Sequence, residues 1–243
     1  MLYNIPNMPR RAEKTEVQEP TIKEISQLYD VLTEEEKEKV LNNHKAIHYK
    51  KNEVIYREGE VPDGLLCLGS GKVKVYKLGF GGRDQIVRMA NPTSFIGYRA
   101  FFAEGPHVAS AVVIEPCTVF YIPKALVFEL LENNHKFSLN IIRSLAQELG
   151  FSRYRTVTLT QKHIRGRLAE SLLVLKEIYG FEDDSSTLNV HLSREDLANF
   201  SNMTTSNAIR TLSTFVNEGV ITVDGRIIKI LDSEKLEKIS KLG

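Results

Sequence analysis

At 243 residues the chain can form one large or two modest domains, and its content of 42% hydrophobic and 26% charged residues is that of an ordinary soluble globular protein. The formal net charge of +1 excludes a generic polycation, and no apolar run approaches the length of a membrane span, so no membrane partner is expected. The N-terminal residues lack the apolar core of a secretory signal, and a cytoplasmic location is therefore expected.

The N-terminal region is expected to begin with an arm and continue into two helices. Residues 1–20 are polar and interrupted by proline, and we interpret them as a flexible N-terminal arm. A short helix is predicted from Glu24 to Tyr29. A clearer helix is predicted from Thr33 to Asn43, because Thr33 and Glu36 form a capping box and acidic residues fill the first turn, where the helix dipole favours them.

From Ala46 to Ile122 short β-branched runs alternate with glycine-containing turns, and nine of the fifteen glycines lie between Gly59 and Gly105. Several short strands separated by turn signals predict a closed β-sandwich or barrel. The strict alternation from Lys72 to Tyr76 is typical of a half-exposed strand. The predicted strands are 53–56, 65–68, 72–76, 85–88, 109–113 and 119–122.

A helix is predicted from Phe128 to Leu159, with a stripe of residues at alternating spacings of three and four. Such a stripe is typical of a coiled-coil dimer, and the alternative is a core stripe within one chain. The predicted dimer seam consists of Ile142, Leu145, Leu149, Ser152, Thr156 and Leu159. A further amphipathic helix is predicted over residues 163–179.

The segment from Leu192 to Ile221 predicts two short helices joined by a tight turn. Ser193 is expected to cap the first helix, with Asp196 in the acidic position of a capping box, and Thr204 to cap the second. The turn falls at Asn202, a residue type that tolerates the left-handed conformation.

The predicted second helix has one apolar and one polar face. Ala208, Leu212 and Phe215 share the apolar face, with Val216 beside it, and the opposite face carries Ser206, Arg210, Ser213 and Asn217. A helix-turn-helix uses this division, docking one side on the first helix and presenting the other to the major groove. The alternative is two core helices with a solvated face.

Two β-rich runs around Asp224-Gly225 predict a hairpin directly after this unit, as in a winged helix. The DNA-binding residues are predicted to be Ser193, Arg194, Thr204, Thr205, Ser206, Arg210, Ser213 and Arg226. Since a helix-turn-helix usually reads paired half-sites as a dimer, duplex DNA with a two-fold symmetric site is the expected partner, and the seam is interpreted as a homodimer interface.

The charge of residues 161–243 does not by itself favour DNA, because 11 Lys and Arg stand against 12 Asp and Glu. The sequence allows a separation of charges by face, with the acidic run Glu182–Asp184 on a loop turned away. The basic residues that would line the other side are Lys162, Arg165, Arg167, Arg194, Arg210 and Arg226.

The two cysteines, Cys67 and Cys117, lie in predicted strands. A free cysteine in such a context is usually a small buried hydrophobe, and a redox-active pair is the less favoured alternative. Two thiols are too few for a four-thiolate iron–sulfur site.

A β-barrel, a long helix and a winged helix-turn-helix, in that order, resemble the Crp/Fnr family of bacterial regulators, of the cyclic-AMP receptor protein type. The motifs that carry the resemblance are residues 56–60, 71–76, 95–97, 165–169 and 192–198. The resemblance implies an α+β fold with a cyclic-nucleotide-binding-like β-roll or jelly-roll barrel over 21–126, a dimerisation helix over 127–160 and a winged helix-turn-helix DNA-binding domain over 161–243. It also implies a homodimer that changes its helix packing on sensing an effector and then binds DNA.

This sequence departs from the family's cyclic-nucleotide pocket. The family has a glutamate directly after the Phe-Ile-Gly motif and an Arg-Ser or Arg-Thr pair further along, where this chain has Tyr98 and then Val108 with Ala109. A cyclic phosphate needs a cation and hydrogen-bond donors, so cyclic AMP is not the expected effector. The family's oxygen-sensing branch has an N-terminal cysteine cluster that residues 1–30 lack, so an iron–sulfur cluster is not expected either.

The DNA-reading helix departs from the family as well. The commonest members begin it with an arginine and a glutamate, where this chain has Thr205 and Ser206, whereas Arg210 matches the family's later arginine. Arg210 is therefore expected to pair bidentately with a guanine, and Thr205 and Ser206 offer hydroxyl or methyl contacts. The operator is expected to be related to the usual half-site but distinct from it.

The effector itself is not identified by the sequence. The predicted pocket consists of Tyr98, Arg99, His107, Ser110 and Ser152, and these residue types favour a small organic molecule less anionic than a cyclic nucleotide. Haem, with His107 as axial ligand, is an alternative because haem-binding relatives exist; a solvated loop histidine is the favoured interpretation of that residue.

Two other classes of protein are alternatives to a DNA-binding regulator. A cupin-type oxygenase needs clustered histidines and a carboxylate on neighbouring strands, and the barrel region has only His48 and His107, so an enzyme is not expected. A sensor that acts through protein partners, with little DNA binding, is the second alternative. Activation of transcription would add RNA polymerase as a partner, with the acidic loop from Phe181 to Ser186 as a contact.

Overall fold

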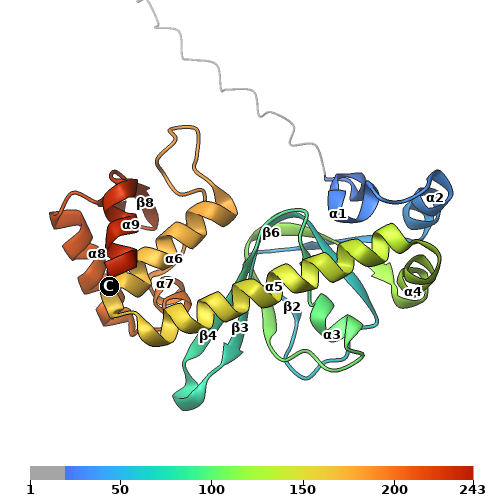
Figure 1. The fold of residues 1–243 in the computed structure, drawn as a ribbon, viewed down its shortest axis with the longest axis horizontal. Helices are drawn as coiled ribbons and strands as arrows, with labels where there is room; N and C mark the ends of the chain where they lie inside the picture. The colour runs from blue at the N-terminus through green and yellow to red at the C-terminus, as the bar shows by residue number, and fades with distance from the viewer. Residues whose placement is uncertain (1–19, 243) are drawn as a thin grey trace, which may run out of the picture.

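The computed structural model describes residues 20–242. It contains a β-barrel domain at one end, a winged-helix unit at the other and a long helix between them (Figure 1). The helices are η1 (Ile22–Glu24), α1 (Ser26–Tyr29), α2 (Glu34–Asn43), η2 (Phe80–Gly82), α3 (Tyr98–Phe102), α4 (Lys124–Asn133), α5 (His135–Gln161), α6 (Ile164–Tyr179), α7 (Arg194–Phe200), α8 (Thr205–Asn217) and α9 (Ser233–Leu242). The strands are β1 (Lys45–Tyr49), β2 (Val54–Tyr56), β3 (Gly64–Leu78), β4 (Asp84–Ala90), β5 (Phe95–Ile96), β6 (Ser110–Pro123), β7 (Ile221–Asp224) and β8 (Ile227–Ile230).

The barrel is an antiparallel sheet in the order β1-β6-β3-β4, with β2 paired to β6 and β5 to β3. The predicted β-rich domain is thus confirmed, but its strands are fewer and longer than the sequence indicates. Residues 65–68 and 72–76 belong to one strand, β3, and residues 109–123 largely to another, β6. Both strands continue through register shifts, which let a twisted strand bend without ending. The expected alternation holds, since Val73 and Val75 are buried between partly exposed lysines.

Gly71 permits a close approach of β3 to β6. Its φ of 78° is in the left-handed region, and a Cβ atom there would lie 2.6 Å from the Cβ of Cys117. Only glycine combines this backbone conformation with such a close approach.

Replacing Gly71 with alanine is expected to destabilise the barrel by about 2–4 kcal/mol, because left-handed strain and overpacking add. Chemical denaturation followed by circular dichroism measures the loss. Gly59→Ala is the matched control, since Gly59 also has a positive φ, of 90°, but a Cβ atom added there would have no heavy atom within 4 Å beyond its chain neighbours. Equal losses in the two variants would show that the approach of β6 is not what requires glycine at residue 71.

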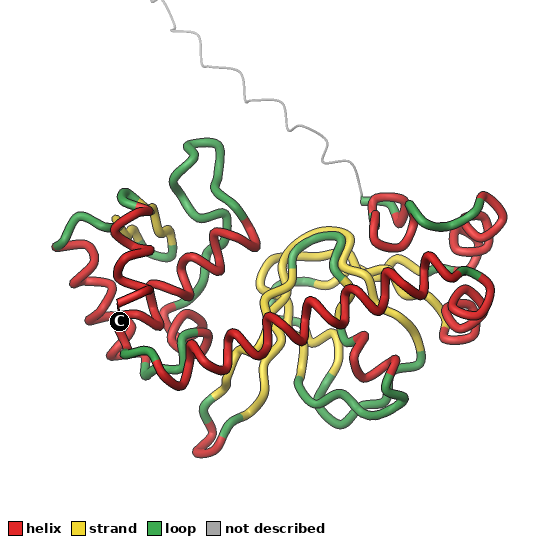
Figure 2. Tube along the Cα trace, viewed as in Figure 1, coloured by secondary structure: helices red, strands yellow, loops and turns green. Residues whose placement is uncertain are grey.

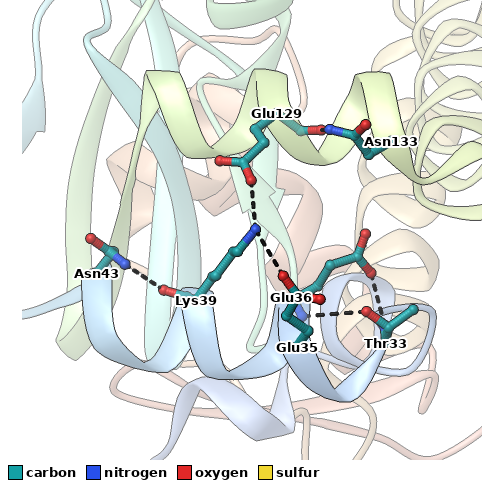
Figure 3. Close-up of polar contacts among 7 residues, drawn as sticks. All are labelled: Thr33, Glu35, Glu36, Lys39, Asn43, Glu129 and Asn133. Carbon is teal, nitrogen blue, oxygen red and sulfur yellow. Dashed lines mark hydrogen bonds and ion pairs between the residues drawn. The ribbon is translucent and has the colours of Figure 1, made fainter.

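The capping box predicted for the second helix is present. The Thr33 hydroxyl accepts from the Glu36 amide at 3.3 Å, and the Glu36 carboxylate accepts from the Thr33 amide at 2.8 Å (Figure 3). Figure 3 also shows Lys39 of α2 between Glu35 and Glu129, at 3.3 and 2.8 Å, which ties α2 to α4. The helix predicted from Glu24 to Tyr29 is instead two short pieces, η1 and α1. The predicted arm, residues 1–20, lies almost entirely outside the described residues.

The single helix predicted from Phe128 to Leu159 is two helices, α4 and α5, which break at Asn134. Asn134 has an extended backbone, and its side-chain oxygen accepts from the Phe137 amide at 3.0 Å, so it caps α5. Its amide group also donates to Val31 and Glu36, at 3.0 and 2.8 Å. The tertiary partners of this asparagine therefore favour a new helix start over continuation of α4.

Helix α5 runs from the barrel to the winged-helix unit, and the β3–β4 hairpin projects beside it toward the same unit (Figures 1 and 2). Ile86 and Met89 of β4 belong to the same buried cluster as Leu168, Phe200 and the rest of the winged-helix core. The β3–β4 hairpin therefore packs the barrel domain against the winged-helix unit. Within residues 20–242, no helix combines the length and apolarity that a bilayer crossing requires.

Candidate DNA-binding and effector sites

The helix-turn-helix has the local structure that its sequence predicts. Ser193 caps α7 by accepting from the Asp196 amide at 2.9 Å, and Thr204 caps α8 by accepting from the Asn207 amide at 3.3 Å. Asn202 lies in the turn with a left-handed φ of 51°. The Asp196 carboxylate differs from the expected capping box, because it accepts from the Ser193 hydroxyl at 2.7 Å.

Helix α8 separates its faces as expected. Ala208, Leu212 and Phe215 are buried, whereas the side chains of Thr205, Ser206, Arg210, Ser213 and Asn217 are exposed. Arg210 makes no side-chain hydrogen bond or ion pair within residues 20–242. Its guanidinium is therefore free to meet a ligand from solvent.

The predicted wing is present as the β7–β8 hairpin, which turns through Gly225 and Arg226. Arg194, at the start of α7, donates to the Gly225 carbonyl at 2.7 Å and so fixes the wing beside the helix-turn-helix. Arg226 at the tip is exposed. Ser193 and Thr204 thus cap α7 and α8, Arg194 is the first residue of α7, and Arg226 lies in the turn of the wing.

Only some of the six basic residues that the sequence suggested would line the DNA-facing side are free to contact DNA. Lys162 pairs with Glu170 at 2.8 Å, Arg165 forms a bidentate pair with Glu218, and Arg167 donates to the Leu159 carbonyl at 3.2 Å. These three cations are therefore engaged by partners within the chain, at the start of α6 and just before it. In the acidic run, Asp184 accepts from Ser186 and Thr187 and pairs with Lys229, and these bonds hold its pKa well below the usual range.

The β3–β4 hairpin contacts the helix-turn-helix directly, through polar groups. Lys74 pairs with Asp196 at 2.5 Å, Gln85 donates to the Asn199 carbonyl at 2.7 Å, and Arg83 donates to the Asn202 side chain at 3.0 Å. The Asn199 carbonyl lies in the last turn of α7, where backbone carbonyls lack partners within the helix, and Gln85 of the hairpin supplies the missing donor. The contacts hold α7 and the turn before α8 against the barrel domain.

Arg155 joins α5 to the same place and was not anticipated from the sequence. It is only 4% exposed, donates to the Phe200 carbonyl at 2.5 Å and lies 4.3 Å above the Phe200 ring. Burial lowers the pKa of its guanidinium to about 10, and one of its nitrogens has no hydrogen-bond partner among the residues that the structure describes. No periodicity marks this residue, because its partner is distant in sequence.

A cavity of about 500 Å³ lies between the barrel and α5. Of the predicted pocket residues, Tyr98, Arg99, His107 and Ser152 line it. Ser110 does not; its hydroxyl instead accepts from the Glu58 amide at 2.9 Å, so its inclusion is corrected. The other lining residues are Tyr56, Val75, Lys77, Val87, Arg88, Gly97, Ala100, Val108, Ala109, Leu145, Glu148, Leu149 and Phe151.

The cavity contains an arginine that the family motif does not mark. Arg88 of β4 pairs with Glu148 of α5 at 3.2 Å, donates to the Phe95 carbonyl at 2.8 Å and stacks over Tyr98. The pair joins the barrel to α5 across the cavity. His107 is 5% exposed and stacks on Tyr56 with 3.8 Å between ring centroids, so it is not the solvated loop histidine favoured by the sequence.

Burial lowers the pKa of His107 from 6.5, and nearby Arg99 lowers it further against the opposing effect of Glu60. A histidine with a lowered folded pKa binds fewer protons when folded, so its contribution to stability is present above pH 6.5 and is lost as the pH falls through the folded pKa. We expect His107→Gln to lose less thermal stability than the parent between pH 7.5 and 5. His135→Gln, at an exposed position, controls for loss of a histidine, and parallel pH profiles for parent and His107→Gln would contradict the assignment.

The exposed row on α5 differs from the predicted seam. Ile142, Leu149, Ser152 and Thr156 are exposed, whereas Leu159 is partly buried and Leu145 packs against the barrel core. Leu145, Leu149 and Ser152 also line the cavity. The predicted seam and the exposed row share residues 142, 149 and 156 and differ by one residue at the positions between them, where one helical residue is turned about 100° from the next. The exposed row is Ile142, Ala146, Leu149, Arg153, Thr156 and Thr160.

Both cysteines are free and buried in the barrel. Burial raises the pKa of Cys117 to about 11 and that of Cys67 further still. Since the thiolate is the reactive form, these thiols behave as the small buried hydrophobes that the sequence favours.

Comparison with known proteins agrees with this arrangement. Residues 46–134 match the cyclic nucleotide-binding domain, and residues 166–239 match the Crp-like helix-turn-helix domain; together these cover more than half of the chain. The chain is 24% identical over 193 residues to the CRP-like cAMP-activated global transcriptional regulator of Mycobacterium tuberculosis, covering 79% of this chain and 86% of that protein. It is 26% identical over 197 residues to the nitrogen fixation regulation protein FixK of Bradyrhizobium diazoefficiens, covering 81% and 82%.

The fold is that of FixK2 from Bradyrhizobium japonicum, with a TM-score of 0.73, 23% identity, and coverage of 81% of this chain and 96% of that one. The α+β architecture expected from the sequence is therefore confirmed, with an antiparallel jelly-roll-like domain before a helix-turn-helix. The proteins that share both domains are transcriptional regulators and not enzymes, so the oxygenase alternative is set aside. This chain, with its cyclic nucleotide-binding domain and its Crp-like helix-turn-helix, belongs to the Crp/Fnr family of transcriptional regulators.

Proposed function

We propose that this protein is a homodimeric, sequence-specific regulator in which an effector bound between the barrel and α5 controls how the winged helix meets a two-fold symmetric operator. The exposed face of α8 carries this proposal. It presents Arg210 among small polar residues and without a partner in residues 20–242, while its opposite face is buried. An arginine so placed suits bidentate contact with guanine in the major groove.

The dimer is proposed from the exposed row on α5. Ile142 and Leu149 are 60% and 53% exposed, and Val157 beside the row is 53% exposed. Aliphatic side chains at heptad spacing on a long helix bury this surface when two copies pair. The row becomes polar at Arg153 and Thr156, nearer the winged helix, so the apolar contact is concentrated beside the barrel.

The effector is proposed to occupy the 500 Å³ cavity and to be a small organic molecule, not cyclic AMP, haem or an iron–sulfur cluster. Tyr98 replaces the pocket glutamate, and the cavity's Arg88 is already paired with Glu148. A cyclic phosphate would have to compete with that carboxylate for its cation. The effector of the mycobacterial relative is cyclic AMP by its name, and this chain is proposed to have diverged from it.

Coupling between cavity and DNA is proposed to pass through the same elements that line the cavity. Val75 on β3 and Val87 on β4 face the effector, while Lys74 and Gln85 on those strands hold α7. On α5, Phe151 both lines the cavity and packs against the winged-helix core, and Arg155 follows one turn later. A ligand that shifts α5 against the hairpin would therefore shift the support of α8.

Selection from a random duplex library by the purified protein tests the proposal. The expected result is an enriched inverted repeat whose half-sites are separated by about one helical turn of DNA, roughly 10 base pairs from centre to centre. A guanine should recur at one position in each half-site. Salt-dependent binding without any enriched sequence, or no binding to duplex DNA, would favour instead a sensor that acts through protein partners.

A further inference from the structure

The lining of the effector cavity restricts the chemistry of its ligand. Much of the wall is aliphatic or aromatic, and its volume is within the range of small-molecule sites. The apolar residues come from the barrel and from α5 alike, so they surround a ligand on both sides. The principal ones are Val75, Val87, Ala109, Leu145, Leu149 and Phe151.

Two of the three long cations around this wall are already satisfied. Arg88 is held by Glu148 and by the Phe95 carbonyl. Lys77 is held by Glu58 and by the Val108 carbonyl, the latter at 3.1 Å. Arg99 is the one other lysine or arginine among the described lining residues. A ligand with more than one negative charge would therefore have to break one of these pairs to neutralise its second charge.

Arg99 and His107 remain without side-chain hydrogen bonds or ion pairs within residues 20–242, although the His107 ring is stacked on Tyr56. Arg99 is exposed at the cavity, so its guanidinium keeps its charge in contact with solvent. His107 is only 5% exposed, and it lines the same cavity as Arg99. An imidazole that lines the cavity can donate a hydrogen bond to a ligand there.

We propose that the effector is a largely apolar monocarboxylate, whose carboxylate meets Arg99 and accepts from His107 while its hydrocarbon part fills the cavity. This inference rests on the proposed use of the cavity as the effector site. A single carboxylate matches one free guanidinium, which binds it bidentately, and the neighbouring imidazole supplies a further donor. The apolar part gains its affinity from burial against the aliphatic wall.

Calorimetric titration with 1-naphthylacetate tests this class, with 2-(1-naphthyl)ethanol as the neutral ligand of nearly the same shape. The acid is expected to bind one molecule per chain, with about tenfold higher affinity than the alcohol, since a charge-assisted bond at an exposed site is partly screened. Arg99→Gln should weaken the acid about tenfold and leave the alcohol unchanged, whereas Arg99→Lys should retain only part of the preference for the acid, because lysine keeps the charge but loses the bidentate geometry.

Equal affinity for acid and alcohol, no effect of Arg99→Gln, or tighter binding of cyclic AMP than of the acid would each overturn the proposal. Because Arg99 is exposed, its substitution is expected to leave the fold intact. Library selection with the same preparations separates this result from the DNA-reading proposal. A protein that enriches an inverted repeat but binds neither naphthyl ligand refutes the ligand class and leaves the DNA-reading proposal standing.

Discussion

Arg210→Ala is expected to lose most of the preference for the selected operator over a scrambled duplex, while weak nonspecific binding survives. One bidentate arginine–guanine pair contributes about 1–3 kcal/mol of discrimination, and a dimer makes two, so the affinity ratio should fall roughly thirtyfold to 10⁴-fold. Arg210 is exposed and unpaired within residues 20–242, so its removal disturbs no contact of the described fold. Fluorescence anisotropy at one fixed salt concentration measures both affinities.

Arg226→Ala is the matched control for that result, because Arg226 is exposed on the wing, where we expect it to contact the phosphate backbone and not the bases. It should weaken operator and scrambled duplex by a similar factor and reduce the salt dependence of binding by about one phosphate contact per protomer. If Arg210→Ala instead behaved like Arg226→Ala, with the specificity ratio retained, α8 would not read bases through this residue.

Ile142→Glu is expected to convert the proposed dimer into a monomer and with it to abolish high-affinity operator binding. In the single chain Ile142 is 60% exposed, so a carboxylate there costs little. In a paired seam two copies would bury like charges, and a buried charge without a partner costs several kcal/mol. Sedimentation velocity measures the assembly, and anisotropy with the operator measures the functional loss.

Arg143→Glu tests whether the effect belongs to the seam. Residue 143 is also exposed but is turned about 100° around α5 from residue 142. This variant should remain dimeric and bind the operator. A dimeric Ile142→Glu variant would mean that the exposed row of α5 is not the interface, and a monomeric Arg143→Glu variant would place the contact on another face of the helix.

Local patterns predicted the parts of the molecule whose structure depends on neighbouring residues. The caps at Thr33, Ser193 and Thr204, and the two faces of α8, follow from spacing that a helix imposes wherever it lies. The β7–β8 wing likewise follows from one turn between two β-rich runs.

Features that depend on distant residues could not be predicted in this way. Arg155 is one of several arginines in the sequence, and only the fold places it against Phe200. Arg88 lines the cavity because β4 lies opposite α5, and this arginine was accordingly missed, although Arg99 was predicted. The break at Asn134 did have a local signal, since asparagine is a preferred cap, but the apolar pattern continued across it and obscured that signal.

The central claim, that α8 reads guanine through Arg210, is tested most directly by combining the protein variant with a change in the DNA. In the selected operator, the recurring guanine of each half-site is replaced by 7-deazaguanine, which lacks the N7 acceptor. The change should weaken the parent protein by roughly tenfold or more and leave Arg210→Ala almost unaffected, because the two changes remove the same bond. Equal and additive losses in the parent and the variant would show that Arg210 does not contact that guanine and would contradict this account of operator recognition.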